Sequence, residues 1–188
     1  MAQAKTLTAQ EVKQVLGAIA LDKHAKRNRA MFLLTCWAGM RVGEVAALSV
    51  GDVMDENGLV RNEIRLNAEI TKNKHARTVF VNERLQKELQ SYAKELERVE
   101  ATDAFFYTQK RRAFTANTLA QHFFWLYKRA NLQGASSHSG RRTFITTLAA
   151  KGVGVRVLAA LAGHADIKTT QFYIDVNDDM KRQAVALI

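Results

Sequence analysis

The chain has 188 residues, 47% hydrophobic and 24% charged, so it is long enough to bury a sizeable core and too apolar to be disordered. Its 28 Lys and Arg residues against 18 Asp and Glu give a net charge of +10, a balance typical of proteins that bind nucleic acid. A single cysteine, Cys36, argues against disulfides, and no apolar run is long enough for a membrane span, so we expect a cytoplasmic protein.

The first third of the chain predicts three helices. Thr8 and Glu11 have the spacing of a capping box, and apolar residues then recur every three or four positions. Two further apolar segments, 29–37 and 42–48, are separated by glycine and polar residues, which favours two more helices. We expect the three helices to pack together, with Cys36 in the core.

The middle of the chain changes its hydrophobic period from that of a helix to that of a strand. Residues 59–66 alternate in part between apolar and polar side chains, and residues 78–81 are rich in β-branched and aromatic types. Between them lies the polar, basic segment 71–77. We therefore predict two or three short antiparallel strands, with 71–77 at the tip of a hairpin.

The rest of the chain returns to a helical pattern. The predicted helices are 85–99, 116–130, 140–150, 156–162, 168–174 and 180–187. No internal repeat, low-complexity tract or flexible linker divides the sequence. Residues 1–188 are therefore predicted to form one α+β domain that is mainly helical, with a small antiparallel sheet.

Tyr173 is a candidate nucleophile because it follows a histidine by nine residues in a strongly basic chain. A phenol, with an ordinary pKa of about 10, reacts only where other groups hold an electrophile and neutralise charge. Arginines clamp phosphates through forked donors, a lysine can protonate a departing oxygen, and imidazoles donate hydrogen bonds or move protons. The residues of these types that stand out are Arg41, Lys72, His138, Arg141 and His164.

The order of these residues resembles the catalytic domain of the tyrosine recombinases, also called the phage integrase family. The resemblance covers nearly the whole chain. It is carried by AGMRVGEVAALSVGDV around Arg41, TKNKHARTVFV around Lys72, HSGR from His138 to Arg141, and AGHADIKTTQFYIDV from His164 past Tyr173. One such segment alone is weak, whereas four in the family's order are specific.

The resemblance implies cleavage and rejoining of double-stranded DNA without a metal or another cofactor. By this resemblance, Tyr173 attacks a backbone phosphate, forms a 3′-phosphotyrosyl bond and releases a 5′-hydroxyl, and a partner strand's hydroxyl reverses the step. The resemblance also implies roles for the other residues: phosphate binding for Arg41 and Arg141, general acid catalysis for Lys72, assistance for His138 and His164, and support of the site for Glu44.

Other basic residues beside these segments are expected to contact DNA, namely Lys74, Arg77, Arg142 and Lys168. Lys72 is preferred to Lys74 as the acid because it precedes Arg77 by five residues, which matches the family segment. No group of ligand-type residues has the spacing of a metal site, so none is predicted.

Two features of the resemblance concern the ends of the chain. The family's N-terminal DNA-clamping domain is expected to be absent, because the first-arginine segment begins within 40 residues of Met1. The amphipathic segment 178–188 is expected either to act as an exchanged tail helix in a tetrameric synapse on DNA or to fold back onto its own domain.

The sequence departs from the family pattern near the second arginine. Arg142 stands where the family usually has histidine, and Gly140 stands where it usually has an apolar residue. We therefore expect different packing beneath this helix start, with the residues matched to the site unchanged.

Two other functions fit the same residues. A DNA-binding regulator would keep the fold without recombining DNA, and a type IB topoisomerase-like enzyme would nick and close DNA without strand exchange. Each residue taken alone also has a structural explanation: Tyr173 as a packed aromatic, Arg41 as a local partner of Glu44, and the two histidines as helix-end residues. The complete set favours an active enzyme and leaves recombinase and topoisomerase unresolved.

Overall fold

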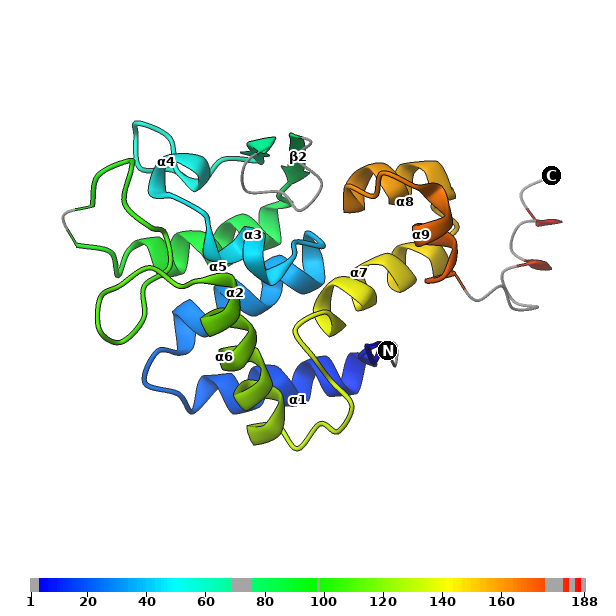
Figure 1. Ribbon diagram of the computed structural model, residues 1–188, viewed down its shortest axis with the longest axis horizontal. Helices are drawn as coiled ribbons and strands as arrows, with labels where there is room; N and C mark the ends of the chain where they lie inside the picture. Colours follow the sequence, from blue (N-terminus) through cyan, green and yellow to red (C-terminus); the bar gives the residue numbers. More distant parts are fainter. Residues whose placement is uncertain (1–3, 69–75, 98, 175–180, 183–184, 187–188) are drawn as a thin grey trace.

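The computed structural model describes residues 4–68, 76–97, 99–174, 181–182 and 185–186, which form a mostly helical fold with one small sheet (Figure 1). The elements are α1 (Ala9–Ala20), α2 (Ala25–Trp37), α3 (Val42–Ala46), α4 (Val50–Val53), β1 (Glu63–Leu66), β2 (Arg77–Phe80), α5 (Glu83–Ala93), α6 (Ala116–Arg129), α7 (Ser139–Ala150), α8 (Val155–Ala162) and α9 (Ile167–Gln171). The predicted fold class is confirmed. No helix in these described ranges is long and apolar enough to cross a membrane.

Helix α2 is the centre of the fold. It packs against α1, α5 and α7, and its residues from Ala30 to Cys36 are all buried. The first turn of α2 carries the polar residues 26–29, so apolar periodicity marked only the second half of the helix and the predicted start at 29 was four residues late. The capping box of α1 is confirmed, because Thr8 and Glu11 exchange backbone-to-side-chain hydrogen bonds of 2.9 and 3.2 Å.

The two strands pair antiparallel, with Glu63 opposite Phe80 and Leu66 opposite Arg77. Ile64, Leu66 and Val79 are buried, so the sheet turns one face to the core. The prediction of a hairpin is confirmed, and of its two or three strands the described residues contain two. Most of the predicted turn, residues 71–75, lies outside the described residues, and Arg77 is the first residue of β2 instead of the last residue of the turn.

The helix predictions need three corrections. Helix α5 ends at Ala93, so the prediction of a helix to residue 99 was wrong. Helix α9 ends at Gln171, which places Tyr173 in the turn that follows instead of in a helix 168–174. The short α4, capped by Ser49, was not predicted. Of the predicted helix 180–187, only residues 181–182 and 185–186 are described.

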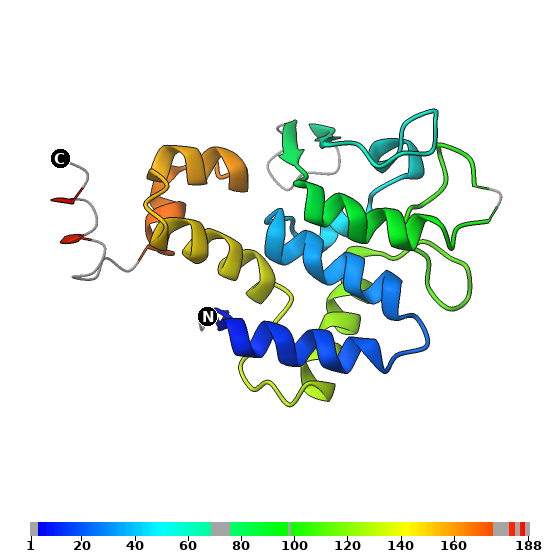
Figure 2. The same cartoon turned by 180° about the vertical axis from the view of Figure 1, so that it is seen from behind.

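Helices α7, α8 and α9 lie together at one end of the molecule in both views, and the described segment that leads into α1 lies beside α7 (Figures 1 and 2). Helix α7 connects this end to the rest through its contact with α2. Gly140, in the first turn of α7, makes the close approach possible. A Cβ at Gly140 would collide with the Thr35 hydroxyl and lie 2.8 Å from the Thr35 Cβ.

We therefore expect Gly140→Ala to lower the free energy of unfolding by about 1–3 kcal/mol, the usual cost of overpacking a tight contact. Gly17→Ala is the matched control, because Gly17 lies in α1 with nothing within 4 Å of an added Cβ. There we expect stabilisation by about 0.5–1 kcal/mol from helix propensity. Urea unfolding measures both, and the same sign at the two positions would contradict the packing argument.

Candidate functional site

Three arginines from three separate segments converge on the end of α8. Each donates a hydrogen bond to one of three successive carbonyl groups there. The pairs are Arg77 with Leu161 at 2.8 Å, Arg141 with Ala162 at 2.5 Å, and Arg41 with Gly163 at 3.4 Å. The last carbonyls of a helix have no partner within the helix and carry partial negative charge, so cations are favoured beside them. The end of α8 therefore assembles α3, β2 and α7 into one site.

A single buried carboxylate balances part of this charge. Glu44 is 1% exposed and accepts hydrogen bonds from Arg41 Nη1 at 2.9 Å and from Arg77 Nη2 at 2.7 Å. Burial raises the pKa of Glu44, but the ion pairs with Arg77 and Arg41 outweigh it and hold the pKa below its ordinary value. Within the described ranges no other carboxylate pairs with the three arginines, so the cluster is strongly cationic.

Arg141 is the most deeply buried of the three cations. It is 3% exposed, and its Nη1 also donates to the Gly39 carbonyl at 2.6 Å. Burial and the charge of Arg41 lower its pKa to about 9, so it stays protonated at neutral pH. Gly39 has a φ of +65°, and a Cβ there would lie 2.5 Å from the Phe144 ring, so glycine is required to present this carbonyl.

His164 follows the end of α8 directly. Gly163 ends the helix in the left-handed conformation, with a φ of +62°, and the side-chain stem of Arg77 occupies the place where a Cβ would be. The Nδ1 atom of His164 lies 2.8 Å from the hydroxyl of Thr170, which is fully buried. Burial and the three nearby arginines lower the pKa of His164 to about 4, so the imidazole is neutral at pH 7.

Tyr173 lies against His164. The two rings are stacked, with centroids 5.8 Å apart and planes at 24°, and the Arg142 guanidinium lies over the tyrosine ring at 5.2 Å. A pocket of about 290 Å³ opens at this point. Its lining residues are Ala4, His138, Arg142, Thr169, Phe172 and Tyr173. The candidate nucleophile thus forms part of a pocket wall beside the cationic cluster.

His138 precedes α7 at its N-cap, is exposed, and lines the same pocket as Tyr173. Arg141, in the same first turn, is buried among the arginines. The structure thus brings Arg41, Glu44, Arg141, His164 and Tyr173 together, with His138 at the pocket rim. Lys72 and Lys74 lie outside the described residues, and Lys168 is exposed on α9.

Sequence reasoning missed the position of Arg77. It was expected to contact DNA, whereas its side chain is 8% exposed and bridges Glu44 to the end of α8. Strand alternation was the available signal, since Arg77 and Val79 are two residues apart and share the buried face of β2. The basic turn before Arg77 concealed this pattern.

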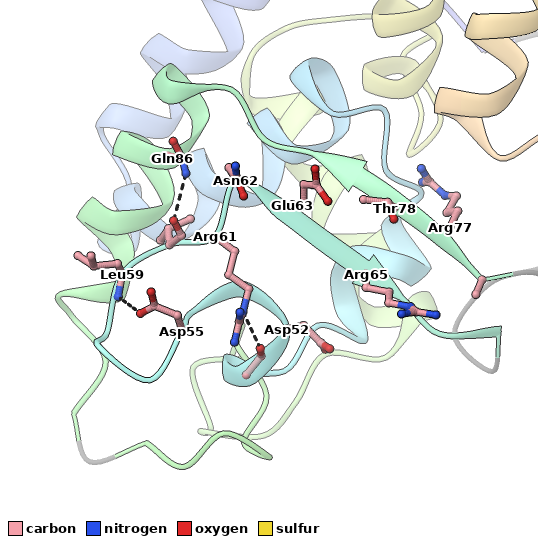
Figure 3. Close-up of a pocket in the computed structure, with 13 residues that line it drawn as sticks. Asp52, Asp55, Leu59, Arg61, Asn62, Glu63, Arg65, Arg77, Thr78 and Gln86 are labelled. Atoms are coloured by element: carbon pink, nitrogen blue, oxygen red, sulfur yellow. Dashed lines mark hydrogen bonds between the residues drawn. The ribbon is translucent and has the colours of Figure 1, made fainter.

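A groove of about 1100 Å³ runs beside the sheet (Figure 3), and Tyr173 is not among its lining residues. Its walls carry both acidic and basic side chains, and Arg61 is engaged with the Gly51 and Met54 carbonyls at 3.3 and 3.1 Å. Of its lining residues only Arg77 belongs to the cationic cluster. In the part of the chain that the structure describes, no group of three or more His, Cys, Asp or Glu could hold a metal ion. Because the groove is not lined by Tyr173, the arginine cluster is a better candidate for the reaction site than the groove.

Comparisons with known proteins agree on one family. Residues 5–180 match the family model described as the phage integrase family. Tyrosine recombinase XerC of Caldanaerobacter subterraneus subsp. tengcongensis is 30% identical over 184 residues, 95% of this chain and 49% of that protein. Tyrosine recombinase XerA of Thermococcus kodakarensis is 30% identical over 183 residues, 96% of this chain and 61% of that protein. The chain thus spans about half to three fifths of the length of these relatives.

Solved structures give the same fold. A crystal structure of XerA recombinase superposes with a TM-score of 0.78 at 26% identity, covering 100% of this chain and 66% of that one. XerH site-specific recombinase bound to a palindromic difH substrate superposes with a TM-score of 0.73 at 23% identity, covering 96% of this chain and 52% of that one. At 23% identity, the similarity to XerH is evidence for a shared fold only.

Arg77→Ala is expected to lower the free energy of unfolding by roughly 3 kcal/mol, because it removes one partner of a buried ion pair and leaves the Leu161 carbonyl without its donor. Arg65→Ala on the neighbouring strand is the control. Arg65 is exposed opposite Thr78, so we expect a change within about 0.5 kcal/mol. Equal losses in urea unfolding would refute the special position of Arg77.

The pKa of His164 also predicts how stability depends on pH. In the folded protein it is about 4, against an ordinary value of 6.5, so the unfolded chain takes up the proton first as the pH falls. This contribution to stability is present above pH 6.5 and is lost as the pH falls toward 4. The urea midpoint should therefore decrease between pH 7 and pH 5, and it should decrease less in His164→Gln. His122, whose burial also lowers its pKa to about 4, acts equally in both proteins. The same decrease in both would contradict the expected effect of His164.

Proposed function

Because the chain belongs to the phage integrase family, we propose that it is a tyrosine recombinase catalytic domain that cleaves and rejoins DNA through Tyr173. In this reaction the Tyr173 hydroxyl gives up its proton as its oxygen bonds to a backbone phosphorus, and the bond from phosphorus to the 5′-oxygen breaks. The 5′-oxygen takes up a proton and leaves as a hydroxyl, while the DNA 3′ end stays on the tyrosine. Attack by a 5′-hydroxyl reverses the step, so no external energy source is needed.

The observation that carries the proposal is the cluster of three arginines and one carboxylate beside the tyrosine. A phosphodiester has one negative charge, and more charge develops on its nonbridging oxygens as the fifth bond forms. Cations that are already desolvated stabilise that charge without reorganising. The excess positive charge around Glu44 therefore suits the transition state of phosphoryl transfer.

Arg41 and Arg141 are proposed to bind the scissile phosphate. Arg41 has the longer hydrogen bond to α8, 3.4 Å, and is 18% exposed, so it can exchange this carbonyl for a phosphate oxygen at little cost. Arg141 is held by two carbonyls, yet a guanidinium has five N–H donors, which leaves others for an anion. Arg77 and Glu44 are proposed to hold these two arginines in place.

Neutral His164 is proposed to donate a hydrogen bond to a nonbridging phosphate oxygen, because a low pKa removes its charge but leaves one N–H. His138, at the N-cap of α7, is proposed to assist from the pocket rim. Lys72 is proposed as the general acid for the 5′-oxygen on the strength of the family resemblance. Lys74 and Lys168 are proposed to contact the DNA backbone.

The partner is proposed to be double-stranded DNA, and the site of action is therefore proposed to be the cytoplasm. Proteins with this fold include a lambda integrase fragment solved as a dimer bound to a COC′ core site. We propose by resemblance that residues 1–188 act as one catalytic domain and self-associate in a tetrameric synapse through residues 178–188. The net charge of +10 supports binding to a polyanion.

The test is capture of the covalent intermediate. A pool of nicked duplexes with randomised sequence lets the short 5′-hydroxyl fragment escape after cleavage, so a protein–DNA adduct accumulates and is seen on a denaturing gel. We expect an adduct from the wild type and from Tyr107→Phe, and none from Tyr173→Phe. An adduct that persists in Tyr173→Phe, or its absence from the wild type across the pool, would disprove the proposal.

The DNA recovered from the adduct identifies the sequence that the protein cleaves. Assays on this selected sequence then distinguish a recombinase from a topoisomerase-like enzyme and from a regulator. A recombinase exchanges strands between two duplexes that carry the site, whereas a topoisomerase-like enzyme only relaxes a supercoiled plasmid. A regulator binds the site without forming an adduct.

A further inference from the structure

Arg142 connects the N-terminal segment, residues 4–8, to the tyrosine. Its Nε atom donates a hydrogen bond to the Thr6 hydroxyl at 2.9 Å, and its guanidinium carbon lies 5.2 Å from the centroid of the Tyr173 ring. The face of an aromatic ring attracts a cation at this distance. One side chain on α7 thus contacts two segments that lie far apart in the sequence.

The N-terminal segment is itself fixed on α7. Leu7 is 3% exposed, and its backbone N–H donates to the hydroxyl of Thr143 at 2.8 Å. Thr8 then caps α1, so the segment is held at two successive residues, Leu7 and Thr8. Ala4 lines the pocket that Tyr173 also lines. The segment is therefore part of the pocket wall, which agrees with its position beside α7 (Figures 1 and 2).

Among the described residues, two side chains make ring contacts that orient the Tyr173 ring. Tyr173 lies beyond the last residue of α9, a helix of five residues, and its backbone N–H donates to the Thr170 carbonyl at 3.0 Å. The ring itself contacts His164 and Arg142. Because the main chain of such a turn leaves the side chain free to rotate, these two ring contacts select its orientation.

We propose that Arg142 is a positioning residue for Tyr173 and that Thr6 holds Arg142, so the N-terminal segment controls the orientation of the nucleophile. The inference rests on the proposed function of Tyr173. It is an alternative to the expectation that Arg142 contacts DNA, because its Nε atom donates to Thr6 and its guanidinium lies over the Tyr173 ring. Anything that moves residues 4–8 away from α7 then loosens the tyrosine and slows cleavage.

A double-mutant cycle tests the coupling. Single-turnover cleavage of the selected nicked substrate, at saturating protein, is measured for wild type, Thr6→Val, Arg142→Ala and the double variant. We expect Arg142→Ala to slow cleavage roughly 10-fold or more, since small displacements of a reacting group have effects of this size. Thr6→Val should slow the wild type by a smaller factor and have no effect once Arg142 is gone. Equal effects of Thr6→Val in both backgrounds would overturn the coupling.

DNA binding separates a positioning role from a phosphate contact. Loss of a phosphate contact lowers the slope of log K against log salt by about one, whereas loss of a positioning residue leaves the slope unchanged. We expect the slope of Arg142→Ala to equal that of the wild type, and a lower slope would return Arg142 to the DNA contacts. Arg156→Ala, an exposed arginine on α8, is the control and should cleave at the wild-type rate.

A second measurement needs neither DNA nor cleavage. With 3-fluorotyrosine at the four tyrosines, the Tyr173 resonance is assigned by its loss in Tyr173→Phe. We expect Arg142→Ala to shift this ¹⁹F resonance, and Thr6→Val to shift it only when Arg142 is present. A resonance that responds to neither change overturns the inference even if cleavage is observed. A resonance that responds as expected, in a protein that forms no adduct, disproves the proposed function alone.

Discussion

The unpaired carbonyl groups at the end of α8 determine the arrangement of the site. A helix end leaves acceptors that must be satisfied, and here three guanidinium groups satisfy them from three directions. Each donor belongs to a different element, so one hydrogen-bonding requirement fixes α3, β2 and α7 relative to α8. His164 follows directly and takes its position from the same anchor. The site residues therefore lie close together because they satisfy, or directly follow, the unpaired carbonyl groups at the end of α8.

The same arrangement has an electrostatic cost. Burial, together with repulsion among the closely spaced arginines, lowers the pKa of Arg141 to about 9 and that of His164 to about 4. Glu44 offsets part of the repulsion through two ion pairs. An anion that enters the cluster relieves the remainder, and in the proposed function that anion is a DNA phosphate. Binding and stability are coupled through this cluster.

Much of the site could be predicted from the sequence, because the segments around Arg41, His138–Arg141 and His164–Tyr173 are local patterns in a recognisable order. The mainly helical fold and the hairpin could also be predicted, because the spacing of apolar residues along the chain is a local pattern too. The burial of Arg77 and the bond between Thr6 and Arg142 could not be predicted in this way. These contacts join residues 84 and 136 positions apart, and no local pattern specifies which distant backbone or hydroxyl group meets a side chain. The requirement for glycine at position 140 could not be predicted either. It arises because an added Cβ would collide with Thr35, which lies on another helix.

The distances along the chain between the arginines and α8 also bear on the order of folding. Arg41 and Arg77 are separated from their carbonyl partners by 122 and 84 residues, and even Arg141 is separated by 21. Contacts that close such long loops form only after much of the chain entropy has been lost. A chain whose synthesis has not yet reached α8 therefore holds no assembled arginine cluster. In the proposed function, such a chain lacks the assembled groups that activate Tyr173, so it leaves DNA uncut.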